Sequence, residues 1–78
     1  MQRGNKMTTA QLDAGRSLRI LMAERGINNK TLQQDLGLSD TTISTLRRNK
    51  LISGRNLVML ADYFDLTAAQ FILKGEPK

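Results

Sequence analysis

The stretch NKTLQQDLGLSDTTISTLRR, residues 29–48, decides how this chain folds. Leu32 and Leu36 stand four positions apart, which places both side chains on the same face of a short helix. Gly37 follows directly and suits the left-handed backbone in which many helices end. Ser39 can cap a second helix, because its hydroxyl can accept a hydrogen bond from a free N–H of the first turn. The stretch therefore predicts two short helices joined by a tight turn.

The second of these helices, expected over about 40–48, has an apolar and a polar face. Ile43 and Leu46 can hold the apolar face against the rest of the domain. This is the layout of a helix-turn-helix, whose second helix stands out from the body. Short hydroxyl side chains on such a helix can reach base edges in a major groove, and cations beside it can reach phosphates. The side chains opposite Ile43 are Thr41, Ser44, Thr45 and Arg48, and the basic ones around the helix end are Arg47, Arg48, Lys50 and Arg55.

A longer helix precedes this stretch. Thr8 and Gln11 have the spacing of a capping box, in which each side chain covers the other residue's free backbone N–H. Apolar residues then recur at helical spacing as far as Gly26, which suits the end of a helix. We therefore expect a helix over about 9–25. Its inward side chains are those of Ala14, Leu18, Leu21 and Met22.

Two more helices follow the stretch. Ser53 or Gly54 opens the first of them, whose apolar residues have the spacing i, i+3, i+4, i+7. Thr67 with Gln70 has capping-box spacing again and starts the last helix, which is expected to end near Leu73. Because no alternating β-branched run exists, the chain is predicted to be all-α, with five short helices in one compact domain. The apolar stripe after Gly54 is Leu57, Leu60, Ala61 and Phe64.

Seventy-eight residues are enough for one domain with a modest core. Residues 1–7 are basic and show no apolar periodicity, so we interpret them as a flexible N-terminal arm. Residues 8–74 are predicted to form the helix-turn-helix domain, with the motif itself over 29–48. A glycine and a proline close the chain, so residues 75–78 are expected to be a disordered tail.

Charge and composition narrow the function. Twelve Lys and Arg against seven Asp and Glu give a net charge of +5, which favours a polyanionic partner, although such a charge also serves solubility. The chain has no cysteine and no histidine, so we expect neither an enzyme nor a cofactor or metal site. No run approaches the roughly 18 apolar residues of a membrane span, and the N-terminus has no apolar signal core. We therefore expect no contact with a membrane and a location in the cytoplasm.

From about Gly15 to Ile72, these features together resemble the phage-repressor and Cro helix-turn-helix family, also called the xenobiotic-response-element type. The resemblance covers about three-quarters of the chain. It implies a compact, lambda-repressor-like DNA-binding domain that is often dimeric and binds near-palindromic operators. The segments that carry it are Leu18…Gly26-Ile27, Leu32…Leu36-Gly37-Leu38, Ile43…Leu46…Lys50 and Leu57…Leu60-Ala61…Phe64…Leu66…Phe71.

The resemblance also implies roles for individual residues. Some correspond to positions where the family reads bases, and others to positions near phosphates or, for Arg55 in some members, the minor groove. The same side chains also fit a solvated face or the charge preferences of helix ends, Asp40 above all. The expected base readers are Asp40, Thr41, Ser44 and Thr45. The expected contacts with the DNA backbone are Asn28, Asn29, Arg47, Arg48, Lys50 and Arg55.

Apolar residues in and after the loop near residue 50 suggest a surface for a partner. The resemblance places a dimer contact in this region, so a homodimer is expected, and another protein is the alternative partner. The residues expected at the interface are Leu51, Ile52, Val58 and Met59.

One departure from the family concerns Arg47. The family often pairs an arginine at the position of Met22 with a glutamate at that of Arg47, and this chain lacks both. Losing both partners can be nearly neutral, whereas losing one would strand a partly buried charge. We therefore expect Arg47 to be free to point towards a phosphate.

Together these observations predict a sequence-specific regulator of transcription that binds double-stranded DNA. We expect a small Cro-like repressor, of phage or prophage type, at the nucleoid of a bacterial or phage-infected cell. The alternative is an antitoxin, or an accessory recombination or interaction module, that uses the same scaffold.

Overall fold

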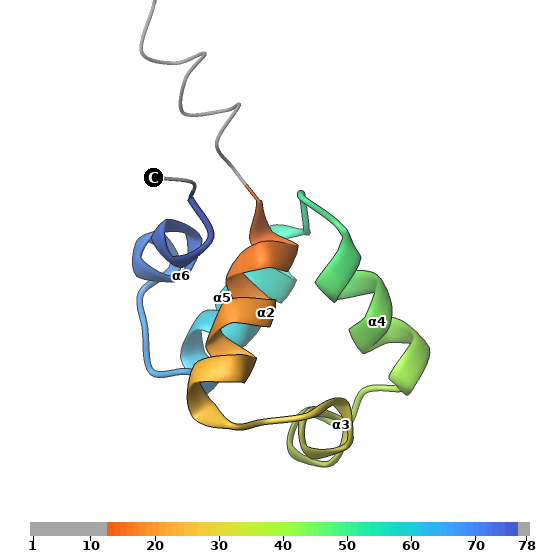
Figure 1. Ribbon diagram of the computed structural model, residues 1–78. Helices are drawn as coiled ribbons and strands as arrows, with labels where there is room; N and C mark the ends of the chain where they lie inside the picture. Colours follow the sequence, from red (N-terminus) through yellow and green to blue (C-terminus); the bar gives the residue numbers. More distant parts are fainter. Residues whose placement is uncertain (1–12, 77–78) are drawn as a thin grey trace, which may run out of the picture.

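The computed structural model describes residues 13–76, and all the regular structure in this range is helical. The predicted all-α class is therefore confirmed. None of the helices in the described range is long and apolar enough to cross a membrane. The helices are α2 (Ala14–Arg25), α3 (Asn29–Leu36), α4 (Asp40–Arg48), α5 (Gly54–Tyr63) and α6 (Ala68–Lys74) (Figure 1).

Helix α2 is the central element of the domain. It packs against α4 on one side and against α6 on the other, while α3 packs on α4 and α5 packs on α6 (Figure 1). The helix-turn-helix pair α3–α4 therefore forms one end of the molecule. Its position depends mainly on the contact between α4 and α2.

The helix ends follow the capping residues of the sequence. Gly26 and Gly37 have φ of 65° and 69°, the left-handed conformation that a side chain would disfavour. Thr67 and Gln70 form the reciprocal capping box that their spacing predicts. Each of the described helices starts after a short polar residue whose side chain accepts a hydrogen bond from a backbone N–H, as predicted for Ser39. These residues are Asp13, Asn28, Ser39, Ser53 and Thr67.

The expectation that the first helix starts near residue 9 is wrong. Asp13 is not helical, and its carboxylate accepts the N–H of Arg16 at 3.0 Å. The N–H groups of Ala14 and Gly15 bond to carbonyls after α4 rather than to a preceding helical turn. Helix α2 therefore starts at Ala14. The capping box expected at Thr8 and Gln11 lies outside the described residues.

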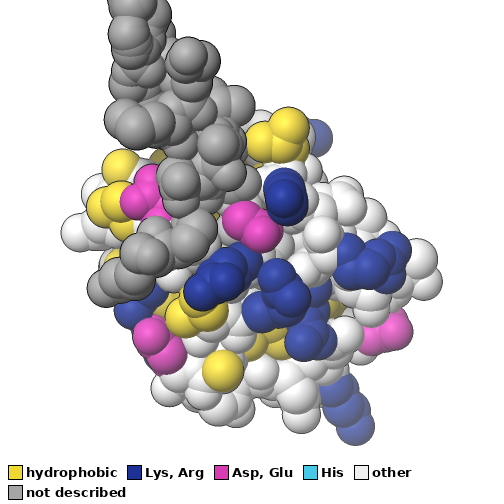
Figure 2. Space-filling model, turned by 45° about the horizontal axis from the view of Figure 1, so that its top comes forward, with side chains coloured by type: hydrophobic (Ala, Val, Ile, Leu, Met, Phe, Trp, Pro, Cys, Tyr) yellow, Lys and Arg dark blue, Asp and Glu magenta, His cyan; other side chains and the backbone are white. Residues whose placement is uncertain are grey.

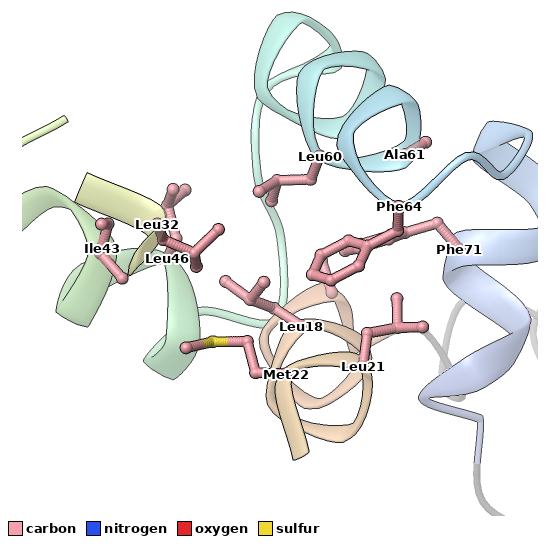
Figure 3. Packing of buried hydrophobic residues seen from close by; sticks show 11 residues of the cluster. Leu18, Leu21, Met22, Leu32, Ile43, Leu46, Leu60, Ala61, Phe64 and Phe71 are labelled. Carbon is pink, nitrogen blue, oxygen red and sulfur yellow. The ribbon is translucent and has the colours of Figure 1, made fainter. Parts of the chain in front are cut away.

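The core has two connected halves (Figure 3). Leu32, from α3, lies beside the buried side chains of α4, and Phe64 and Phe71 fill the space between α2, α5 and α6. Leu18 of α2 lies between these two groups and is fully buried. Leu36 was expected to be inward and is only half-buried, so Leu32 alone anchors α3 fully.

The last described residues pack on the domain. Gly75 is buried, and a Cβ there would lie 2.5 Å from the hydroxyl of Ser17. The hydroxyl of Ser17 in turn donates to the carbonyl of Ile72 at 3.2 Å. The expectation that disorder begins at Gly75 is therefore wrong, because close contact with α2 keeps this glycine in place.

Candidate nucleic-acid interface

Helix α4 is held by one face, as its apolar spacing predicts. Ile43 and Leu46 are 1% and 5% exposed. Leu38, in the turn between the helices, is half-buried and packs against the core. Asp40 and Thr41, at the start of α4, are exposed. The helix therefore presents its polar side and its N-terminal turn to the outside.

Three of the four expected base readers line hollows on the two sides of α4. Thr41 and Thr45 line a cleft between α4 and the start of α5, whereas Ser44 lines a separate groove between α4 and α2. Thr41 is exposed, and Ser44 and Thr45 are half-buried. Helix α4 thus forms a ridge between two hollows. The other residues of the first cleft are Thr42, Leu46, Asn49, Leu51, Ile52, Ser53 and Asn56.

Sequence reasoning missed Thr42 in this cleft. Thr42 is exposed, and its Oγ1 accepts a hydrogen bond from the capping hydroxyl of Ser39 at 2.9 Å. The spacing Ser-x-x-Thr after a turn could have indicated this contact, because a capping side chain lies close to the residue three positions later. Ser39 therefore fixes the orientation of a hydroxyl beside Thr41.

Three expected DNA contacts form a chain of hydrogen bonds across α3 and α4. Arg47 donates from Nη1 to Oδ1 of Asn29 at 2.8 Å, and Asn29 donates from Nδ2 to Oδ1 of Asp40 at 3.2 Å. We call these three residues the relay. The Asn29 amide has one orientation in it, since its oxygen accepts and its nitrogen donates. The relay thereby orients the Asp40 carboxylate at the N-terminus of α4.

The expectation that Arg47 is free is therefore wrong. Its guanidinium turns towards α3, where Asn29 supplies the acceptor. Arg47 Nε is buried and has no hydrogen-bond partner among residues 13–76. An unsatisfied buried donor costs about 1–3 kcal/mol, so this arrangement is less stable than a fully paired one.

A groove between α2 and α4 collects positive charge. Figure 2 shows dark blue Lys and Arg side chains gathered on the face that carries these two helices. Arg19 was missed by the sequence reasoning, although its place one residue after Leu18 and three before Met22 puts it beside the buried stripe of α2. Its Nε donates to the carbonyl of Gly15 at 3.3 Å. The residues of the groove are Arg19, Ser44, Arg47 and Arg48.

The other residues that we expect to contact the DNA backbone are exposed. Asn28 caps α3, since its Oδ1 accepts both the N–H and the hydroxyl of Thr31. Arg48 and Lys50 are exposed at the C-terminal end of α4, and Arg55 is exposed in the first turn of α5. Asn28 and Lys50 thus stand at opposite ends of the helix-turn-helix pair.

The expected dimer residues divide into two kinds. Leu51 and Val58 are 68% and 55% exposed, whereas Ile52 and Met59 are half-buried and pack against the core. Leu73, on α6, is 60% exposed. It lines an apolar groove between α5 and α6, whose other residues are Leu57, Ala68, Ala69, Ile72 and Glu76.

A family model described as a Cro/C1-type HTH DNA-binding domain matches residues 17–72. These residues include all of α3, α4 and α5, together with the relay and the basic groove. The comparison with curated proteins and the comparison with solved structures gave no match.

Proposed function

Because this chain belongs to the Cro/C1-type HTH DNA-binding family, it is a DNA-binding regulator of transcription, and we propose which kind of regulator it is. It is a small Cro-like repressor that binds a near-palindromic operator in double-stranded DNA as a homodimer. It acts at the nucleoid of a bacterial or phage-infected cell. Its mechanism is occupancy of the operator, which excludes other proteins from the same DNA.

The observation that carries the proposal is the geometry of α4. Ile43 and Leu46 bury one side, and the other side is a ridge of short polar side chains with Arg48 exposed at its end. A ridge of short side chains enters a major groove closely, since nothing bulky holds the backbone away from the bases. The methyl groups of Thr41 and Thr45 suit contact with thymine methyls.

Asp40 has a distinct role in this proposal. Its Oδ1 accepts from Asn29, so Oδ2 is the atom available to a base. A carboxylate accepts only, and cytosine N4 is the donor that the major groove offers for it. Asp40 therefore favours a cytosine opposite the start of α4, while Ser44 and Thr45 read positions farther along the groove.

Cations around the motif position it on the duplex. Arg48, Lys50 and Arg55 are exposed and contact phosphates, and Asn28 and Asn29 lie at the α3 N-terminus, where backbone N–H groups favour an anion. Two copies read half-sites about 34 Å apart, one turn of the double helix.

The direct experiment selects bound duplexes from a random pool. We expect a recovered sequence with two-fold symmetry and half-sites about one helical turn apart. Binding to it should exceed binding to random duplex by at least roughly 10³-fold at physiological salt. Recovery of unrelated sequences with equal affinity would contradict the proposal.

A second candidate function is an interaction module, such as an antitoxin, on the same scaffold. The apolar groove between α5 and α6, with Leu73 exposed, favours it, because such a surface suits a protein partner. Purification from the native host separates the two. A stoichiometric second protein bound to this groove supports the interaction module, and a chain that binds its operator without one supports the repressor.

A further inference from the structure

The groove between α2 and α4 has the features of an anion site. It has a volume of about 510 Å³ and is open to the outside, and three of its four lining residues are arginines. Neither Arg19 nor Arg48 has a carboxylate within ion-pair distance among residues 13–76, where the one ion pair joins Glu24 and Lys74. The positive charge in the groove is therefore not neutralised by the protein's own acidic groups.

The two walls of the groove are fixed relative to each other. The N–H groups of Ala14 and Gly15 donate to the carbonyls of Lys50 and Asn49, each at 2.8 Å. The start of α2 is thereby attached to the chain that leaves α4. Arg19 is also held, because its Nε donates to the carbonyl of Gly15 one turn earlier. Its terminal nitrogens then project from a defined point on the wall, so little conformational entropy is lost when an anion binds.

The side chains of the groove match a phosphate in kind. Guanidinium groups bind phosphate oxygens through paired N–H donors, and the hydroxyl of Ser44 adds a donor from the α4 wall. The groove lies beside the C-terminal half of α4, on the side away from the cleft that holds Thr41 and Thr45. If α4 lies in a major groove, the neighbouring DNA backbone passes this side.

We propose that Arg19, together with Ser44 and Arg48, binds one backbone phosphate of the operator. This inference rests on the proposed function and adds α2 to the DNA-binding surface. The ligand is a phosphodiester in a duplex rather than free phosphate, because the groove is open and continuous with the ridge of α4.

The test combines a variant with a matched control. Arg19→Gln removes the charged guanidinium from the groove, and Arg16→Gln removes the same charge from an exposed site on the same helix that does not line the groove. Both variants are titrated with the selected operator at several salt concentrations. We expect Arg19→Gln to weaken binding roughly tenfold for every sequence and to reduce the salt slope by about one unit, with a much smaller effect of Arg16→Gln.

A second measurement identifies the phosphate. A neutral methylphosphonate is placed at each linkage of the operator in turn. At one linkage the wild-type chain and Arg16→Gln should lose affinity, whereas Arg19→Gln should lose much less, because only the contacts of Ser44 and Arg48 with that phosphate remain. Inorganic phosphate at millimolar concentration should not compete with the operator beyond the effect of ionic strength.

The outcomes separate this inference from the proposed function. If the wild-type chain binds the operator but Arg19→Gln matches Arg16→Gln at every linkage, the proposed phosphate site is wrong. The proposed function as a regulator would then still stand. If the wild-type chain binds no duplex, the proposed function and the phosphate site both fail. Specific competition by free phosphate would also overturn the assignment to a duplex phosphodiester.

Discussion

At the scale of single residues, the relay decides what Asp40 can do. A lone aspartate at the start of α4 would rotate freely and would be repelled by phosphates. Asn29 holds it by one oxygen, and Arg47 fixes the Asn29 amide from the other side. Arg47 thus acts on base recognition through two other residues, as a positioning residue rather than as a direct DNA contact.

Arg47→Met tests this role. Methionine keeps the length of the side chain but removes the donor to Asn29, so the orientation of Asp40 is lost. We expect discrimination at the base pair read by Asp40 to fall about fivefold, in addition to a uniform loss of affinity from the missing charge. Arg48→Met, which removes the same charge outside the relay, should weaken all sequences equally. Equal behaviour of the two variants across a panel of operator mutants would contradict the role of the relay.

Tyr63 gives a pH-dependent contribution to stability. Its hydroxyl donates to the Asp35 carboxylate, which links α5 to α3. That hydrogen bond, with burial and the charge of Asp35, raises the pKa of Tyr63 above its ordinary value of 10.0. The unfolded chain therefore loses the phenol proton at lower pH than the folded chain. The stabilisation is complete below about pH 10 and is lost as the pH rises through the folded pKa.

Tyr63→Phe should remove this dependence. Urea unfolding from about pH 8 to about pH 11 gives the free energies of unfolding of the wild-type chain and of Tyr63→Phe, and their difference measures the contribution of the hydrogen bond. We expect this difference to be constant below about pH 10 and to shrink above it. Curves that stay parallel over the whole range would show that the hydrogen bond does not affect stability.

At the scale of elements, the position of α4 depends on a close contact with α2. A Cβ on Gly15 would lie 2.6 Å from the carbonyl oxygen of Arg47 and 2.7 Å from that of Asn49. Both are backbone atoms, which cannot move aside as a flexible side chain can. Only glycine therefore lets the start of α2 donate its N–H groups to the end of α4.

Gly15→Ala should accordingly destabilise the domain by about 1–3 kcal/mol, because overpacking displaces backbone. Gly54→Ala is the matched control, since Gly54 also starts a helix but a Cβ there meets nothing within 4 Å. It should be neutral or stabilising by up to about 1 kcal/mol, because alanine favours a helix. Thermal unfolding measures both, and equal midpoints for the two variants would refute the close contact.

The same contact shows what the sequence could and could not predict. Helix positions followed from local signals such as the glycine after Leu36 and the capping box at Thr67, because these act within one turn. The true start of α2 had one local signal, the capping residue Asp13, which the sequence analysis did not use. It also depends on carbonyls at positions 49 and 50, which no local pattern reveals. Arg19 was missed for the same reason, since it becomes part of the groove only when α2 packs on α4.

At the scale of the whole molecule, two exposed apolar surfaces are candidates for the dimer interface. Val58 on α5 belongs to the surface that the sequence predicts, and Leu73 belongs to the groove between α5 and α6. Leu51 is more exposed than either, but it also lines the cleft beside Thr45. A substitution of Leu51 would therefore alter DNA binding and dimerisation together, so it cannot decide between the two surfaces.

Val58→Glu and Leu73→Glu are a matched pair for this decision. Both residues are exposed, so a glutamate should leave folding nearly unchanged, and each variant places one charge on one surface. We expect Val58→Glu to raise the dimer dissociation constant at least tenfold and Leu73→Glu to have little effect, because a buried charge at the centre of an interface is costly. Sedimentation over a range of concentrations measures the constant. The Val58→Glu variant should also bind the two operator half-sites independently. If Leu73→Glu weakens the dimer more than Val58→Glu does, the interface lies on α6 instead.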